Sequence, residues 1–143
     1  SVGVQNTGDL TRRCLRFRIN QTFPRYGAWC ASLFDLIERG LNPAVTSTVT
    51  LLELLVQPYR DQKDELAQRI FALAGTYPRL EWVSVTMNVA DRAAELRARY
   101  RLSTPDAIQL ATAILHKAVR FYGNDRGLRK VKEIECVLID ELI

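Results

Sequence analysis

The sequence predicts a single α/β domain, residues 1–143, in which a mainly parallel sheet lies between helices. Short runs of β-branched and aromatic residues alternate along the chain with longer segments whose apolar residues recur every three or four positions. Strands separated by helices pair in parallel, because each helix returns the chain to the edge where the previous strand began. The length suits one domain with its own core, and no linker or repeat divides the chain.

The first half of the chain is predicted to begin with a short strand at residues 2–4, where two valines alternate with a glycine. A helix over 24–39 begins at a proline and ends before a glycine, the residue most typical of helix C-termini. The β-branched residues of 44–50 predict a strand that runs into a helix, and we expect that helix to stop at Pro58. A further apolar stripe predicts a helix over 61–74.

The second half continues the alternation, with a predicted strand over 80–87 and an amphipathic helix over 88–100. Thr104 is the expected N-cap of the next helix, with Pro105 as its first residue and small apolar side chains along its buried face. The remaining predicted elements are a strand over 119–122, a turn over 123–127, a short helix over 128–131 and a last strand over 136–139.

The composition is that of an ordinary globular protein, with 48% hydrophobic residues and a formal net charge of +4. The mild excess of basic residues is compatible with a nucleic-acid partner. No apolar run approaches the roughly 20 residues of a membrane span, and the first residues do not resemble a signal peptide. Three widely spaced cysteines, Cys14, Cys30 and Cys136, indicate reduced thiols and a cytoplasmic protein. Because His116 is the only histidine, we expect any catalysis to depend on carboxylates.

Three carboxylates stand where a parallel sheet brings chain segments together. Glu53 lies near the start of a helix that follows a strand, Asp106 lies in the first turn of another helix, and Asp125 follows a strand. Each has an ordinary explanation by itself: Glu53 as a solvated position, Asp106 as a residue that complements the helix dipole, and Asp125 as a turn former. At one end of a sheet their charges would repel, and a bound Mg²⁺ or Mn²⁺ would relieve the repulsion. Such a cation activates water and neutralises charge on a phosphodiester.

Four segments stand out by their order and spacing: residues 47–55, 92–100, 104–113 and 123–125. The third contains the run Asp-Ala-Ile-Gln-Leu-Ala-Thr-Ala, which is close to a family signature. Together they resemble the PIN domain, in particular the VapC-type toxins of bacterial toxin–antitoxin pairs. The resemblance covers about residues 24–139, and it implies a three-layer αβα fold with a mainly parallel central sheet flanked by helices.

The resemblance also implies an endoribonuclease that uses Mg²⁺ or Mn²⁺ to cleave single-stranded RNA. By this resemblance, Glu53, Asp106 and Asp125 match three acidic positions of the catalytic metal site. Asn124 matches the small polar residue that commonly precedes the last acid. Family members are often homodimers and are held inactive by a cognate antitoxin protein, so we expect these partners here and no membrane.

The divergent N-terminal segment, residues 1–23, departs from the family pattern. PIN domains open with a short strand that ends in an Asp, usually in Asp-Thr-Asn or Asp-Thr-Ser, and here Asn6 stands in the place of that acid. Asn6 and Asp9 are therefore supporting candidates for the fourth ligand position. Loss of the acid would weaken the metal site, so a second hypothesis is a PIN fold that binds RNA or an antitoxin without cleaving. A generic nucleotide-binding domain is disfavoured, because the chain has no Gly-rich phosphate loop.

Arginines form a second group of candidate functional residues. They are Arg12, Arg13, Arg16 and Arg18 in the N-terminal segment, and Arg126 and Arg129 after the last acid. We expect some of them to flank the acidic cleft and hold the RNA backbone, which would make binding depend on salt. The alternative interpretation is a solvated face without a ligand.

Overall fold

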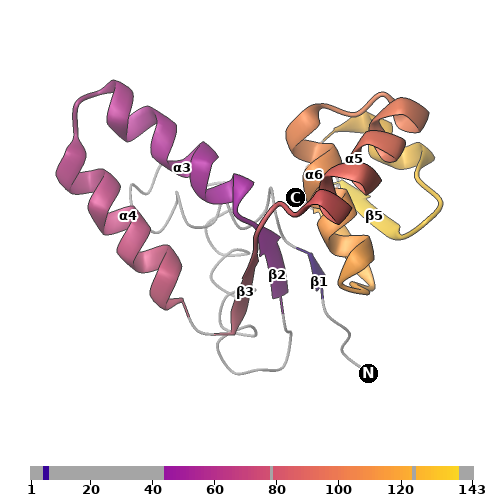
Figure 1. The fold of residues 1–143 in the computed structure, drawn as a ribbon, viewed down its shortest axis with the longest axis horizontal. Coiled ribbons are helices and arrows are strands. Elements are labelled where there is room, and N and C mark those ends of the chain that lie inside the picture. Colours follow the sequence, from indigo (N-terminus) through magenta and orange to yellow (C-terminus); the bar gives the residue numbers. More distant parts are fainter. Residues whose placement is uncertain (1–4, 7–43, 78, 124, 139–143) are drawn as a thin grey trace.

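The computed structural model describes residues 5–6, 44–77, 79–123 and 125–138 (Figure 1). The predictions that lie outside these residues concern the strand at 2–4, the helix over 24–39, Asn124, Asp9, the arginines Arg12, Arg13, Arg16 and Arg18, and the cysteines Cys14 and Cys30.

The described residues form one five-stranded sheet. Its strands are β1 (Gln5–Asn6), β2 (Ala44–Ser47), β3 (Leu80–Val83), β4 (Arg120–Gly123) and β5 (Glu135–Leu138). They lie in the order β3-β2-β1-β4-β5, and every neighbouring pair is parallel. β1 is the central strand, in which Gln5 lies opposite Ala44 of β2 and Arg120 of β4. The strands therefore all end at the same edge of the sheet, where open α/β sheets bind ligands.

Four α-helices and one 3-10 helix are present in the described part of the chain. They are α3 (Val49–Arg60), α4 (Asp64–Thr76), α5 (Met87–Tyr100), α6 (Thr104–Leu115) and the 3-10 helix η1 (Arg126–Lys130). Figure 1 shows α3 and α4 as an antiparallel hairpin that joins β2 to β3, with α5, α6 and β5 on the other side of the molecule. None of the helices in this part of the chain is long and apolar enough to cross a membrane.

The core is built around α6, which packs against β1, β2 and β4 and against α5. On α6, the apolar side chains that are at most 1% exposed are those of Ala107, Leu110, Ala111 and Ala113. The same cluster includes Val89, Ala93 and Leu96 of α5 and Phe121 of β4. The small apolar face predicted for α6 and the apolar stripe predicted for α5 are thus both confirmed as core.

The α/β fold with a parallel sheet is confirmed, and one helix is longer than expected. α3 does not stop at Pro58 but continues through it to Arg60. A proline in the last turn of a helix forgoes a single backbone hydrogen bond, and the buried ring of Pro58 contributes apolar area to the core. The chain leaves α3 through Gln62, which has a positive φ of 56°, so α4 begins at Asp64 rather than at residue 61.

Two further helices begin slightly earlier than the sequence predicts. Ser103, and not Thr104, is the N-cap of α6, because its hydroxyl oxygen accepts the backbone N–H of Asp106 at 3.3 Å. Thr104 is then the first helical residue. Thr86 caps the start of α5 with its side chain, so the strand predicted over 80–87 is shortened to the four residues of β3. In both cases a hydroxyl oxygen accepts an otherwise unpaired backbone N–H of the first helical turn. The sequence pattern alone does not show which residue is the N-cap.

Cys136 lies partly buried on β5, next to two glutamates. Burial first, and then the negative charges of Glu133 and Glu135, raise the pKa of Cys136 from an ordinary 9.0 to about 12. A thiol with a raised pKa favours the folded state while it stays protonated. Its contribution to stability is therefore complete below about pH 9 and is lost as the pH rises through the range from 9 towards 12.

We expect the free energy of unfolding of the parent, relative to that of Cys136→Ser, to be constant below about pH 8.5 and to decrease as the pH rises to about 10.5. Serine does not titrate in this range, so the difference isolates the thiol from the other groups that do. Urea unfolding followed by circular dichroism measures both proteins. A difference that stays constant over the whole range would contradict the raised pKa of Cys136.

Candidate functional site

The three candidate carboxylates belong to segments that begin at the carboxyl edge of the sheet. β2 leads into α3, which carries Glu53, and β4 leads into the turn that carries Asp125. α6 also begins at this edge, because its second turn is hydrogen-bonded to Ser47, the last residue of β2. Asp106 lies one turn earlier on α6 and is placed beyond the same edge.

Glu53 lies one turn into α3, between the buried and exposed faces of the helix. Its neighbours Thr50 and Leu54 are buried, whereas Leu52 is 60% exposed. Glu53 itself is partly buried. The helix therefore buries only one face, and Glu53 lies at the border between that face and the solvent.

Asp106 forms a reciprocal pair with Ser103 at the start of α6. The Ser103 hydroxyl donates to Oδ2 of Asp106 at 2.8 Å, and the backbone N–H of Asp106 donates to Oγ of Ser103 at 3.3 Å. Only the first bond of a capping box is present, because the Asp106 carboxylate accepts from the hydroxyl of Ser103 and not from its backbone N–H. The negative charge also complements the positive end of the helix dipole. Local bonds thus hold this carboxylate in the first turn.

Asp125 is held in the turn after β4 by a backbone N–H. Its Oδ1 accepts from the backbone N–H of Gly127 at 2.8 Å and makes Asp125 the N-cap of η1. The turn is closely packed, because a Cβ on Gly127 would lie 3.1 Å from Oδ1 of Asp125 and 3.2 Å from Cδ2 of Leu102. Leu102 directly precedes the N-cap of α6. The turn of Asp125 therefore lies beside the segment that leads to Asp106.

Asn6, the residue in the place of the missing acid, lies within the sheet rather than at its edge. Its backbone is in register with Val45 of β2 and Phe121 of β4. Both partner strands continue for two residues beyond that level, to Ser47 and Gly123. The described part of β1 therefore ends two residues short of the edge at which β2 and β4 lead to Glu53 and Asp125.

A buried polar network, which the sequence analysis did not predict, joins α6 to the start of α3. Oε1 of Gln109 accepts the backbone N–H of Ser47 at 3.1 Å, and its Nε2 donates to Oγ1 of Thr50. The hydroxyls of Thr50 and Thr46 are hydrogen-bonded at 2.8 Å. All four residues are at most 3% exposed. The apolar composition of α6 could have indicated that Gln109 has partners. A helix that is apolar nearly all round is buried, and a polar side chain in a buried helix needs hydrogen-bond partners.

The donor chemistry of the three acids fits a hard divalent cation, because carboxylate oxygens are the ligands that Mg²⁺ and Mn²⁺ prefer. Among the residues that the structure describes, no three His, Cys, Asp or Glu side chains are close enough together to hold an ion. Asp106 and Asp125 are instead hydrogen-bonded to Ser103 and Gly127. The three acids therefore suit a divalent cation by their chemistry and by their placement at the edge, but they are not grouped around a single ion position.

Two of the candidate arginines lie within four residues after Asp125. Arg126 and Arg129 are exposed side chains of η1, the short helix that Asp125 caps. They add positive charge to the turn that carries one of the three acids, which is favourable for an anionic ligand at this edge.

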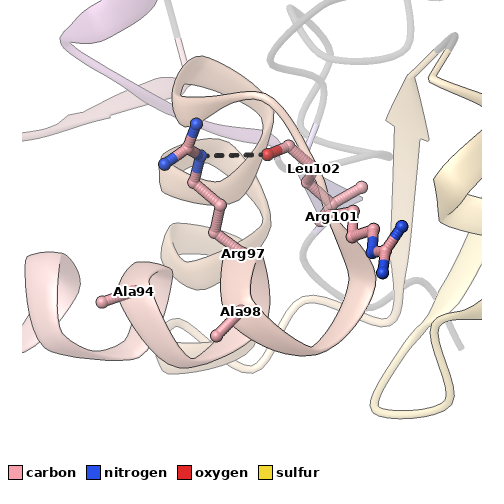
Figure 2. Close-up of a pocket in the computed structure, with 5 residues that line it drawn as sticks. All are labelled: Ala94, Arg97, Ala98, Arg101 and Leu102. Carbon is pink, nitrogen blue, oxygen red and sulfur yellow. Dashed lines mark hydrogen bonds between the residues drawn. The ribbon is translucent and has the colours of Figure 1, made fainter.

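A pocket of about 450 Å³ lies at the C-terminal end of α5 (Figure 2) and is lined by Ala94, Arg97, Ala98, Arg101 and Leu102. Nε of Arg97 donates to the backbone carbonyl of Leu102 at 3.2 Å. Arg101 ends α5 in the left-handed conformation, with a φ of 55°. None of the lining residues is acidic, so this pocket offers no carboxylate ligand for a cation.

The chain belongs to the PIN domain family. The PIN domain family model matches residues 30–134, most of the sequence. This confirms the resemblance that the four sequence segments indicated. A search of curated protein sequences finds no significant match.

Solved structures of bacterial toxins and toxin–antitoxin complexes share the fold. VapBC2 from Rickettsia felis, solved with a promoter DNA fragment, aligns with a TM-score of 0.69 at 16% identity, over 94% of this chain and 98% of that chain. VapC20 from Mycobacterium tuberculosis, described as a toxin that cleaves the sarcin-ricin loop, aligns with a TM-score of 0.66 at 17% identity, over 92% and 98%. A toxin–antitoxin complex from Klebsiella pneumoniae aligns with a TM-score of 0.58 at 19% identity, over 92% and 94%. These similarities establish the αβα fold class of the chain.

Proposed function

We propose that this PIN-domain protein is a metal-dependent endoribonuclease of the VapC toxin type that cleaves single-stranded RNA. The proposal rests on one observation: the segments that contain Glu53, Asp106 and Asp125 all begin at the same edge of a parallel sheet. The fold neighbour VapC20 is described as cleaving the sarcin-ricin loop. That description supports RNA as the class of substrate.

The proposed metal ligands are Glu53, Asp106 and Asp125, with Asn124, Asn6 and Asp9 as supporting candidates. A bound Mg²⁺ or Mn²⁺ would supply an activated water and neutralise charge on the phosphodiester. The chain's own contribution is orientation. Ser103 fixes the Asp106 carboxylate and Gly127 fixes that of Asp125 before any ligand binds, which lowers the entropic cost of assembling the site.

The proposed partners are RNA, a cognate antitoxin and a second copy of the chain, in the cytoplasm. For RNA, Arg126 and Arg129 beside Asp125 would contact phosphates, together with some of Arg12, Arg13, Arg16 and Arg18. For the antitoxin, the support is the toxin–antitoxin complex from Klebsiella pneumoniae among the fold neighbours. The homodimer is proposed by analogy with the family, as is the cytoplasmic location.

A second candidate function is binding of RNA or of an antitoxin without cleavage. Two observations favour it. The sequence resemblance would put Asn6 in the place of the family's first Asp, and the backbone of Asn6 lies within the sheet rather than at the edge. The described residues also contain no closed group of three metal ligands. One fewer carboxylate lowers the affinity for a hard cation.

Cleavage of a fluorescent single-stranded RNA tests the proposal directly. We expect the parent to cut the RNA with Mn²⁺ or Mg²⁺ and not with EDTA. We expect Glu53→Gln to be slower by about 100-fold or more, the scale of losing a group that stabilises transition-state charge. Glu65→Gln, on the exposed surface of α4, is the matched control and should cut at the parental rate.

Two other outcomes are informative. RNA that is retained on a filter by the parent but never cut would favour the second candidate function. Cutting that persists in EDTA, or is equal in the parent and in Glu53→Gln, would contradict the proposed metal-dependent nuclease.

A further inference from the structure

Gln109 bridges three elements through one buried side chain. It lies on α6 and is 3% exposed. One end of its amide accepts the backbone N–H of Ser47, at the end of β2, and the other end donates to Thr50, at the start of α3. Ser47 in turn accepts the backbone N–H of Val49 on its Oγ at 3.2 Å. The start of α3 is thus bonded to α6 through the side chain of Thr50, and the end of β2 is bonded to α6 through the backbone of Ser47.

Gln109 and Thr50 each lie one helical turn from a candidate metal ligand. Gln109 follows Asp106 by three residues on α6, and Thr50 precedes Glu53 by three residues on α3. Residues at this spacing lie on the same side of a helix. The hydrogen bond between Gln109 and Thr50 therefore ties together the two helical turns that lead to Asp106 and Glu53.

We propose that Gln109 is a positioning residue for the candidate metal site, and that it sets the separation of Glu53 and Asp106 through Thr50 and Ser47. This inference rests on the proposed function. Sliding of α3 along α6 would leave a buried donor or acceptor unpaired, which is costly, so the network restricts the two helices to one register. An apolar side chain of similar length would fill the same space without imposing that register.

Thr112 provides the contrast within the same helix. It is fully buried on α6, like Gln109, but its hydroxyl donates to the backbone carbonyl of Ile108 at 2.8 Å, within α6. Its removal would cost a buried hydrogen bond without uncoupling α6 from α3. Thr112→Val is therefore a matched control for a buried polar group that does not position the ligands.

The test measures Mn²⁺ affinity by isothermal titration calorimetry on the full chain, with folding verified by circular dichroism. We expect Gln109→Met and Thr50→Val to bind Mn²⁺ at least about tenfold more weakly than the parent, as for losses of groups that orient metal ligands. Thr50→Ser keeps the hydroxyl and should bind within about twofold of the parent, as should Thr112→Val. If Gln109→Met does not fold, the pair Thr50→Val and Thr50→Ser decides the question, because the two variants differ in the hydroxyl that Gln109 contacts.

Three outcomes would overturn the inference. Parental affinity in Gln109→Met and Thr50→Val would overturn the positioning role while leaving the metal site in place. Equal weakening in all four variants, Thr112→Val included, would assign the loss to general damage of the core. Absence of Mn²⁺ binding by the parent would overturn the proposed function, and the positioning role with it.

Discussion

Replacing Asp125 with asparagine is expected to leave the melting temperature without metal unchanged and to remove most of the rise that Mn²⁺ gives the parent. Asparagine keeps an oxygen that can accept the backbone N–H of Gly127, so the cap of η1 survives. The lost charge weakens a site for a hard cation. At a concentration 100 times the dissociation constant, Mn²⁺ stabilises the parent by about 2.7 kcal/mol, or roughly 5–10 °C for a domain of this size.

Differential scanning fluorimetry with and without millimolar Mn²⁺ measures this effect. Asp91→Asn is the matched control, because it removes the same charge from the exposed surface of α5. It should keep the full metal response. A variant at Asp125 that loses intrinsic stability but responds to Mn²⁺ like the parent would indicate a turn former without a role in metal binding.

Replacing Phe121 with alanine is expected to lower the free energy of unfolding by about 3–5 kcal/mol, the range for a large aromatic side chain removed from a core. Phe121 is fully buried, on a strand that pairs with both β1 and β5. The ring also packs closely against Gly123, where an added Cβ would lie 3.1 Å from its Cε1. Since small domains are stable by only about 5–15 kcal/mol, the loss is a large fraction of the total.

Urea unfolding followed by tryptophan fluorescence measures this loss, and Phe71→Ala is the matched control. Phe71 is 60% exposed on α4, so the same chemical change there should cost less than about 0.5 kcal/mol. Similar losses for the two variants would mean that Phe121 is not at the centre of the core.

The parallel sheet could be predicted from the sequence because parallel pairing requires a crossover element, and the alternation of strands and helices supplies one. The residue at which α3 ends could not be predicted from the sequence. A proline is read as a stop, but in the last turn of a helix it forgoes a single hydrogen bond, and the chain turns only at Gln62. The N-cap of α6 was misplaced by one residue, because Ser103 and Thr104 have the same capping chemistry and only geometry selects between them.

The acids of the candidate site could be recognised because each stands at a helix start or after a strand. The network of Gln109 could be recognised only in part. The apolar helix around this glutamine indicates that it needs buried partners, but the local pattern does not identify them. Its partners here, Ser47 and Thr50, lie 62 and 59 residues away in the sequence, and only the tertiary fold brings them together.

The central position of β1 has a consequence for the order in which the protein is made and folded. β1 precedes the other described strands in the sequence, yet one of its two neighbours, β4, lies far along the chain from it. During synthesis this side of β1 has no partner until β4 has left the ribosome. Pairings between such distant segments form slowly, because the intervening chain must first be ordered. The turn that carries Asp125 follows β4 directly, so the pairing of β1 with β4 and the last acid of the candidate site become available at the same stage of synthesis.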